Sequence, residues 1–117
     1  MGNRIYHFKG NWQTREVSVD GQILSPRPSK KIVNHSPDGF CWGYSGSGPA
    51  QLALAICLKI LGREMAIQIY QGFKSQVIAI LPKEDFDIEI WIAENGKLDW
   101  RETIKVDIPM RGGFNDK

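Results

Sequence analysis

The sequence lacks an apolar run long enough to cross a membrane. Its longest apolar run is Leu52–Leu58, well short of the roughly 18 residues that a membrane-spanning helix needs. Residues 1–4 lead into a mixed polar stretch, unlike the apolar core of a signal peptide. Tyr6 stands where a myristoylated protein has Ser or Thr. We therefore expect a cytoplasmic protein that does not bind membranes.

Cysteine is scarce, and its spacing does not favour a metal site. Cys41 and Cys57 are the two cysteines, and in the cytosol they stay reduced. No pairing of them with His7 or His35 has the short spacing typical of a zinc site. We therefore expect neither a metal nor another cofactor.

Extremes of composition are also missing. The 117 residues are 42% hydrophobic and 24% charged, which fits one compact domain. These values exclude a disordered chain, a collagen-like fibre and a small disulfide-linked protein. We expect a single α+β domain over residues 1–110, followed by a flexible polar tail at 111–117.

Charge is modest in total but uneven along the chain. The net charge of +2 is too small to indicate a nucleic-acid coat. Residues 1–31 hold six basic and two acidic side chains, whereas residues 83–117 hold six basic and nine acidic ones. These charges either pair within the fold or across a dimer, or they form ordinary solvated faces. No predicted helix carries a basic stripe, so we do not expect duplex nucleic acid as a partner.

Alternating apolar and polar residues predict strands at both ends of the chain. The predicted turns are Asp20-Gly21 and Asn95-Gly96. Proline breaks regular structure over residues 25–29. The expected strands cover residues 4–9, 16–19, 22–24, 40–44, 86–92 and 103–108. In the strand at 40–44 the three aromatic rings would share one face.

Two helices are predicted between these strands. The first, over residues 49–61, has Pro49 in its first turn and ends at Gly62. It is apolar on nearly all sides, so we expect it to be buried. The second covers residues 64–81, although a helix that ends near Gln71 and a strand that begins at Gln76 is an alternative. The predicted fold is α+β, with an antiparallel sheet from the N- and C-terminal strands packed on this helix pair.

The segment before the first helix has features that favour anion binding. The first N–H groups of a helix have no partner within it, and the helix dipole places partial positive charge there. Glycines allow a ligand to approach the backbone closely, so the segment resembles a phosphate cradle. The alternative is that the glycines only permit a tight turn. The expected ligand-binding residues are Trp42, Tyr44, Ser45, Gly46, Ser47, Gly48 and Gln51, with the two aromatic rings stacking a base.

Three further residues are candidates for catalysis. His35 precedes a Pro-Asp-Gly turn, and histidine is the usual general acid or base near neutral pH. Tyr70 and Lys74 lie one helical turn apart, where they would stabilise developing negative charge. The alternatives are a backbone-bonded loop histidine, a core tyrosine and a solvated lysine.

Several motifs resemble an uncharacterised domain family of bacterial and phage genomes. They are HSPDGF at 35–40, WGY at 42–44, GSGPAQLALAI at 46–56 and YQGFK at 70–74. The resemblance extends over residues 4–92. Because that family is labelled as a domain of unknown function, membership implies little about activity.

The segment GSGPAQL at 46–52 also resembles the strand–turn–helix of viral ring nucleases, which destroy cyclic oligoadenylate signals. Those proteins are small α+β dimers that act without a metal and carry a histidine beside the turn glycine. Here Ser47 or Gly48 stands in that place, so the histidine would come from elsewhere, such as His35. The resemblance implies an anionic nucleotide ligand, a homodimer and a role in phage–host conflict.

From residues and resemblance together we expect a protein that binds a cyclic oligonucleotide second messenger, with metal-independent cleavage as an extension of that function. The alternative is a non-catalytic interaction or dimerisation module. Its working surface would be the exposed edge of the Phe86–Ile92 hairpin.

Overall fold

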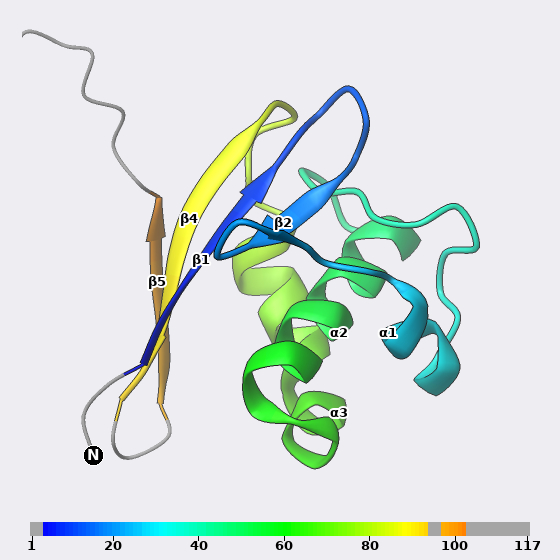
Figure 1. Ribbon diagram of the computed structural model, residues 1–117. Coiled ribbons are helices and arrows are strands. Elements are labelled where there is room, and N and C mark those ends of the chain that lie inside the picture. Colours follow the sequence, from blue (N-terminus) through cyan, green and yellow to red (C-terminus); the bar gives the residue numbers. More distant parts are fainter. Residues whose placement is uncertain (1–3, 94–96, 103–117) are drawn as a thin grey trace, which may run out of the picture.

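A single antiparallel sheet forms one layer of the molecule, and the helices form the other (Figure 1). The computed structural model describes residues 4–93 and 97–102. The strand order is β3-β2-β1-β4-β5, which confirms the predicted α+β class and the joining of N- and C-terminal strands in one sheet. The strands are β1 (Arg4–Gly10), β2 (Val17–Val19), β3 (Gln22–Ile23), β4 (Phe86–Ile92) and β5 (Leu98–Glu102).

The centre of the sheet is the pair β1 and β4, whose residues come from opposite ends of the sequence. They pair antiparallel from Arg4 opposite Ile92 to Gly10 opposite Phe86. Side chains alternate between the two faces of a strand, and the inward residues Phe8 and Ile88 are fully buried. The opposite face of the sheet carries no helix within the described residues (Figure 1).

Within the described residues, four helical segments lie on the inner side of the sheet (Figure 1). They are α1 (Arg27–Ile32), α2 (Ser47–Leu61), α3 (Arg63–Phe73) and a π-helical turn, η1 (Lys74–Ile78). As predicted, α2 is buried on nearly all sides and supplies the centre of the core. Gly62 has a φ of +85°, a left-handed conformation that glycine adopts readily. The chain therefore turns from α2 into α3 without a loop.

The structure decides between the two predictions for residues 64–81 in favour of the helix. η1 continues the direction of α3, and it buries Val77 and Ile78. No strand begins at Gln76. The hydrogen bond from the Ala79 N–H to the Lys74 carbonyl, at 2.8 Å, spans the five residues that are typical of a π-turn.

Three other predictions for regular structure do not hold. Residues 40–44 form no strand; Gly43 has a φ of +86° and donates its N–H to the Ile78 carbonyl at 3.0 Å. Residues 25–29 are not wholly irregular, because α1 begins at Arg27 and accommodates Pro28 in its first turn. α1 also carries three basic residues, so one helix is rich in basic side chains after all.

The edge of the hairpin that was predicted as an interaction surface is formed by β5 and not by Phe86–Ile92 itself. β4 pairs with β1 on one side and with β5 on the other, so the Phe86–Ile92 strand lies inside the sheet. β5 occupies the end of the strand order instead. The predicted turn at 95–96 and strand at 103–108 lie outside the described residues.

Candidate functional site

Gln51, in the first turns of α2, joins two segments through its buried amide group. Its Oε1 accepts hydrogen bonds from the backbone N–H groups of His35 (2.7 Å) and Ser36 (3.0 Å). Its Nε2 donates to Ser29 Oγ (2.9 Å) and to the Val33 carbonyl (3.1 Å). All four hydrogen-bonding positions of the amide are therefore used. Gln51 positions the chain around it, and the ligand contact predicted for it is not supported.

This anchoring places His35 against α3. His35 Nε2 lies 2.8 Å from Tyr70 Oη, and Gln71 Nε2 donates to the same hydroxyl at 3.2 Å. Tyr70 is buried, whereas His35 is half-buried. The structure thus joins two predicted catalytic residues that are 35 positions apart. The third, Lys74, begins η1, and within the described residues no hydrogen bond or ion pair connects it to His35.

The N-terminal end of α2 has no side-chain cap. Gly46 is the N-cap residue, and the first helical hydrogen bond runs from Ala50 N–H to the Gly46 carbonyl. Ser45 and Ser47 are exposed, but Gly48 is buried. A Cβ on Gly48 would lie 2.6 Å from Cys41 Cβ, so this glycine serves close packing. The accessible part of the predicted cradle is therefore the exposed Ser45 and Ser47, with the half-buried Gly46 between them.

Tyr44 covers this end of the helix. A Cβ on Gly46 would lie 2.6 Å from Tyr44 Cε2, so the ring lies against the Gly46 backbone. Lys83 Nζ is 5.9 Å from the ring centroid. Partial burial raises the pKa of the Tyr44 hydroxyl, and its hydrogen bond to Cys41 acts in the same direction. The phenol therefore stays protonated at neutral pH and can donate a hydrogen bond.

Trp42 does not take part in this surface. Its side chain is fully buried, and its ring makes edge contacts with Trp12 (centroids 5.5 Å apart) and Phe86 (4.7 Å). Its Nε1 donates to the Glu84 carbonyl at 2.8 Å. The prediction that Trp42 stacks a base is wrong, because the alternation assumed a strand that does not form.

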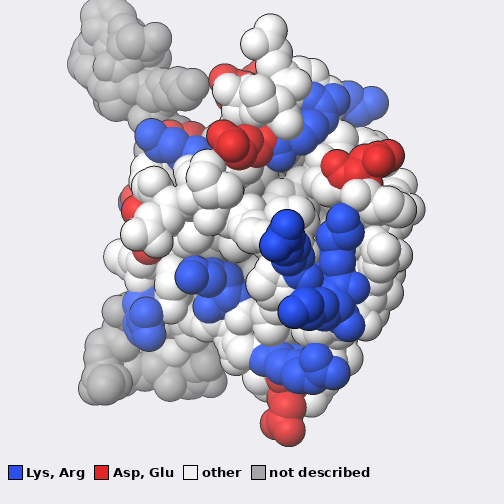
Figure 2. Space-filling model, turned by 45° about the vertical axis from the view of Figure 1, so that its right-hand side comes forward, with Lys and Arg blue, Asp and Glu red and all other residues white. Residues whose placement is uncertain are grey.

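Lys83, whose Nζ lies near the Tyr44 ring, is not among the residues predicted for this segment. The charges of the sequence divide near Lys83. Residues 21–83 hold seven basic and two acidic side chains, whereas residues 84–102 hold two basic and seven acidic ones. Figure 2 shows Lys and Arg side chains gathered on the side of the molecule where α1 lies. Among the described residues, the helical layer therefore carries an excess of basic side chains, and β4 and β5 carry an excess of acidic ones.

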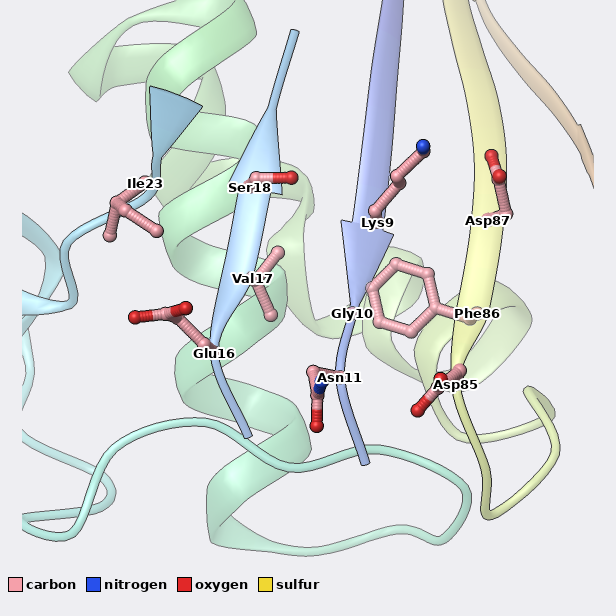
Figure 3. A pocket seen from close by; sticks show the side chains of 10 residues that line it. All are labelled: Lys9, Gly10, Asn11, Glu16, Val17, Ser18, Ile23, Asp85, Phe86 and Asp87. Carbon is pink, nitrogen blue, oxygen red and sulfur yellow. The ribbon is translucent and has the colours of Figure 1, made fainter. Parts of the chain in front are cut away.

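A separate cavity of about 330 Å³ opens on the sheet. Figure 3 shows Lys9 and Asp87 side by side on neighbouring strands, with Glu16 and Asp85 at the same cavity. The His7 imidazole forms a hydrogen bond with the Asp87 carboxylate. Three carboxylates beside one lysine disfavour an anionic ligand, so this cavity is unsuited to a phosphate. Among the described residues, no group of three or more His, Cys, Asp or Glu could hold a metal ion.

The two cysteines differ in exposure, which predicts selective labelling. Cys57 is fully buried, and burial raises the pKa of its thiol to about 12, whereas Cys41 is half-buried. Because the thiolate is the reactive species, a disulfide reagent at pH 8 should modify one thiol in the native protein and two after unfolding. Cys41→Ser should leave none in the native protein, and rapid modification of Cys57 would contradict this.

The same raised pKa makes stability depend on alkaline pH. The Cys57 thiol keeps its proton when folded up to about pH 12, whereas an unfolded thiol loses it above about pH 8.5. The unfolded state then binds fewer protons, so this residue's contribution to stability is complete below that value and falls as the pH rises. Cys57→Ala should remove this part of the pH dependence in urea unfolding between pH 8 and 10.

Comparison with known proteins gives a family but no described relative. No curated protein and no solved structure matches the chain, so the resemblance to ring nucleases depends on the segment at 46–52 alone. Within the described residues no helix has the length and apolar character to cross a membrane. The family match extends over residues 6–101, which includes nearly all of the sheet, α2 and the His35–Tyr70 pair. The chain therefore belongs to a family of unknown function (DUF6166).

Proposed function

We propose that this protein binds a cyclic oligonucleotide second messenger at the segment before α2, in phage–host conflict. The observation that carries the proposal is the uncapped N-terminus of a 15-residue helix, with exposed Ser45 and Ser47 beside it. Backbone N–H groups and the helix dipole favour a phosphate there. Lys83, near the Tyr44 ring, adds a full positive charge.

Tyr44 is the residue that would contact the base. Its side chain is 41% exposed, unlike the buried Trp42, and its ring lies directly over Gly46. A base stacked on an aromatic ring contributes about 1–3 kcal/mol in recognition of single-stranded nucleic acids. Phosphate and base would then be bound by neighbouring residues of one segment.

The His35–Tyr70 pair would supply cleavage. His35 N–H bonds to Gln51 Oε1, which places the histidine beside the first turns of α2. In the proposed reaction His35 takes the proton from a ribose 2′-hydroxyl, and the 2′-oxygen attacks the adjacent phosphorus. The bond from phosphorus to the 5′-oxygen breaks. Tyr70 donates a proton to that oxygen, and the product is a linear chain ending in a 2′,3′-cyclic phosphate.

The expected assembly is a homodimer, because a two-fold axis suits a ligand that is itself cyclic. Self-association is also the second candidate function, a non-catalytic interaction module. The observation that favours it is the position of β5 at the end of the sheet, where no further strand of the described residues pairs with its outer edge and strand addition is open to it.

Calorimetric titration with a panel of cyclic di- and oligoadenylates and their linear counterparts tests binding. We expect at least one cyclic ligand to bind, and Lys83→Glu to weaken it by about tenfold or more, since hydrogen bonds to charged groups contribute about 1.5–3 kcal/mol. Lys59→Glu is the matched control, because Lys59 is in the last turn of α2. Absence of binding across the panel at high micromolar protein would contradict the proposal.

Cleavage is tested separately by chromatography and mass spectrometry of the bound ligand. His35→Gln keeps a hydrogen-bonding group opposite Tyr70 but removes the base. It should retain binding and lose the 2′,3′-cyclic phosphate product. Equal product from the variant and the parent protein would exclude His35 as the base, and binding without any product would leave a sponge as the function.

A further inference from the structure

β5 (Leu98–Glu102) is the last strand of the described sheet, and its outer edge has one unusual feature. Within residues 4–93 and 97–102 its partner strand is β4. The Trp100 N–H donates to the Asp99 side chain, Oδ1, at 2.9 Å, so it is directed away from the β4 ladder. In an antiparallel pair the hydrogen-bonding groups alternate between the two edges of a strand. The outward edge of β5 is therefore centred on Trp100, whose backbone N–H already donates to the Asp99 carboxylate.

The charges on β5 are self-complementary. Asp99 and Arg101 are opposite Trp91 and Glu89 of β4, and residues opposite each other share a face of the sheet. Arg101 bonds to Glu89 Oε1 at 3.2 Å on that face. If two copies of β5 pair antiparallel about Trp100, Asp99 lies opposite the partner's Arg101, and the same pair recurs across the axis.

An apolar cavity lies beside the same strand, on the helical face. It has a volume of about 450 Å³ between α3 and β5. Met65, which lines it, is 46% exposed. In a pair centred on Trp100 the inner faces of both sheets point the same way, so the two α3 helices approach each other over the joined strands. The apolar residues that line the cavity are Met65, Ile69, Phe73, Val77, Leu98 and Trp100.

We infer that β5 is the interface of a symmetric dimer, in which two copies join into one ten-stranded sheet about a two-fold axis at Trp100. The two Trp100 residues exchange backbone hydrogen bonds, as a directly opposed antiparallel pair does. Each Asp99 leaves the Trp100 N–H and pairs with the partner's Arg101. Symmetric pairing of this kind is isologous and closed. The inference gives the proposed homodimer its interface and does not depend on nucleotide binding.

Asp99 has opposite effects in the two states. In the monomer its carboxylate accepts the Trp100 N–H, the donor at the centre of the edge. A charge on an edge strand also discourages pairing with unrelated strands. A second copy of β5 places its Arg101 opposite Asp99, so each Asp99 gains one arginine in exchange for the Trp100 N–H. This selectivity favours a copy of this chain over a strand of another sequence.

Sedimentation velocity of the full chain over a range of concentrations tests the interface. We expect a monomer–dimer equilibrium, which Asp99→Arg shifts toward monomer with a dissociation constant raised about tenfold or more, because like charges then face each other twice. The double variant Asp99→Arg/Arg101→Asp restores opposite charges across the axis and should recover the dimer. Far-UV circular dichroism checks that each variant is folded.

Two results would overturn the inference: a parent protein that stays monomeric at several hundred micromolar, or a dimer that Asp99→Arg leaves unchanged. Trp100→Pro gives a second route to the same answer, since it removes the N–H at the centre of the edge and should also abolish the dimer. Nucleotide titration of the same variants separates the two proposals, because Lys83 and Tyr44 are unchanged in them.

Discussion

Trp42→Ala is expected to lower the free energy of unfolding by about 3–5 kcal/mol, the usual loss for a large aromatic residue removed from a core. Trp42 is fully buried and contacts Trp12 and Phe86 edge to face. Its Nε1 donates to the Glu84 carbonyl, so truncation also leaves that acceptor without its partner. The Trp42 side chain packs the loop before α2 against the start of β4. Its removal therefore costs contacts in both segments.

Urea unfolding followed by fluorescence and circular dichroism measures this loss. Tyr44→Ala is the control, because Tyr44 is 41% exposed and should change stability by less than about 1 kcal/mol. In nucleotide titrations we expect the opposite order of effects, with Tyr44→Ala lowering the affinity for the ligand more than Trp42→Ala does. Similar stability losses for the two variants would show that Trp42 is less buried in solution than in the structure.

Gln51→Leu is expected to lower the free energy of unfolding by about 2–4 kcal/mol, because each buried group left without a hydrogen bond costs about 1–3 kcal/mol. Leucine fits the volume of the side chain but leaves the N–H groups of His35 and Ser36 without their acceptor. Ser29 Oγ and the Val33 carbonyl lose their donor as well. The segment that carries His35 should then separate from α2.

The same variant tests whether Gln51 positions His35. Besides urea unfolding, hydrogen exchange should show faster exchange of the His35 and Ser36 amides, and the imidazole signals in NMR spectra should lose their contact with Tyr70. Gln71→Leu is the control, because Gln71 is exposed and donates only at 3.2 Å to Tyr70 Oη. If Gln51→Leu is as stable as the parent, the amide hydrogen bonds contribute little and the positioning role is wrong.

Local patterns predicted the elements whose own residues determine them. The alternation in 86–92 gives β4, with Phe86, Ile88 and Ile90 buried. The apolar residues of 49–61 give α2, which begins at Ser47 and ends before Gly62. Burial of these side chains depends on a periodicity that can be read within one segment.

Features set by distant parts of the chain could not be read in this way. β4 lies inside the sheet because β1 pairs with it across some 80 residues, and no local pattern encodes that partner. Gln51 looked like a ligand contact because its position in the first turn of a helix gives no sign of Ser29 or Val33. The aromatic alternation at 40–44 failed because Gly43 adopts a positive φ, which rotates Tyr44 away from the face of Trp42.

The opposite charges of the two layers give the molecule an electric dipole moment. Its positive end is the helical layer, with seven basic and two acidic residues in 21–83, and its negative end includes β4 and β5. A field of this kind turns an approaching polyanion before any contact forms. At physiological ionic strength it acts over about 8 Å. A diffusing phosphate ester is therefore repelled from β4 and β5 and directed toward the helices.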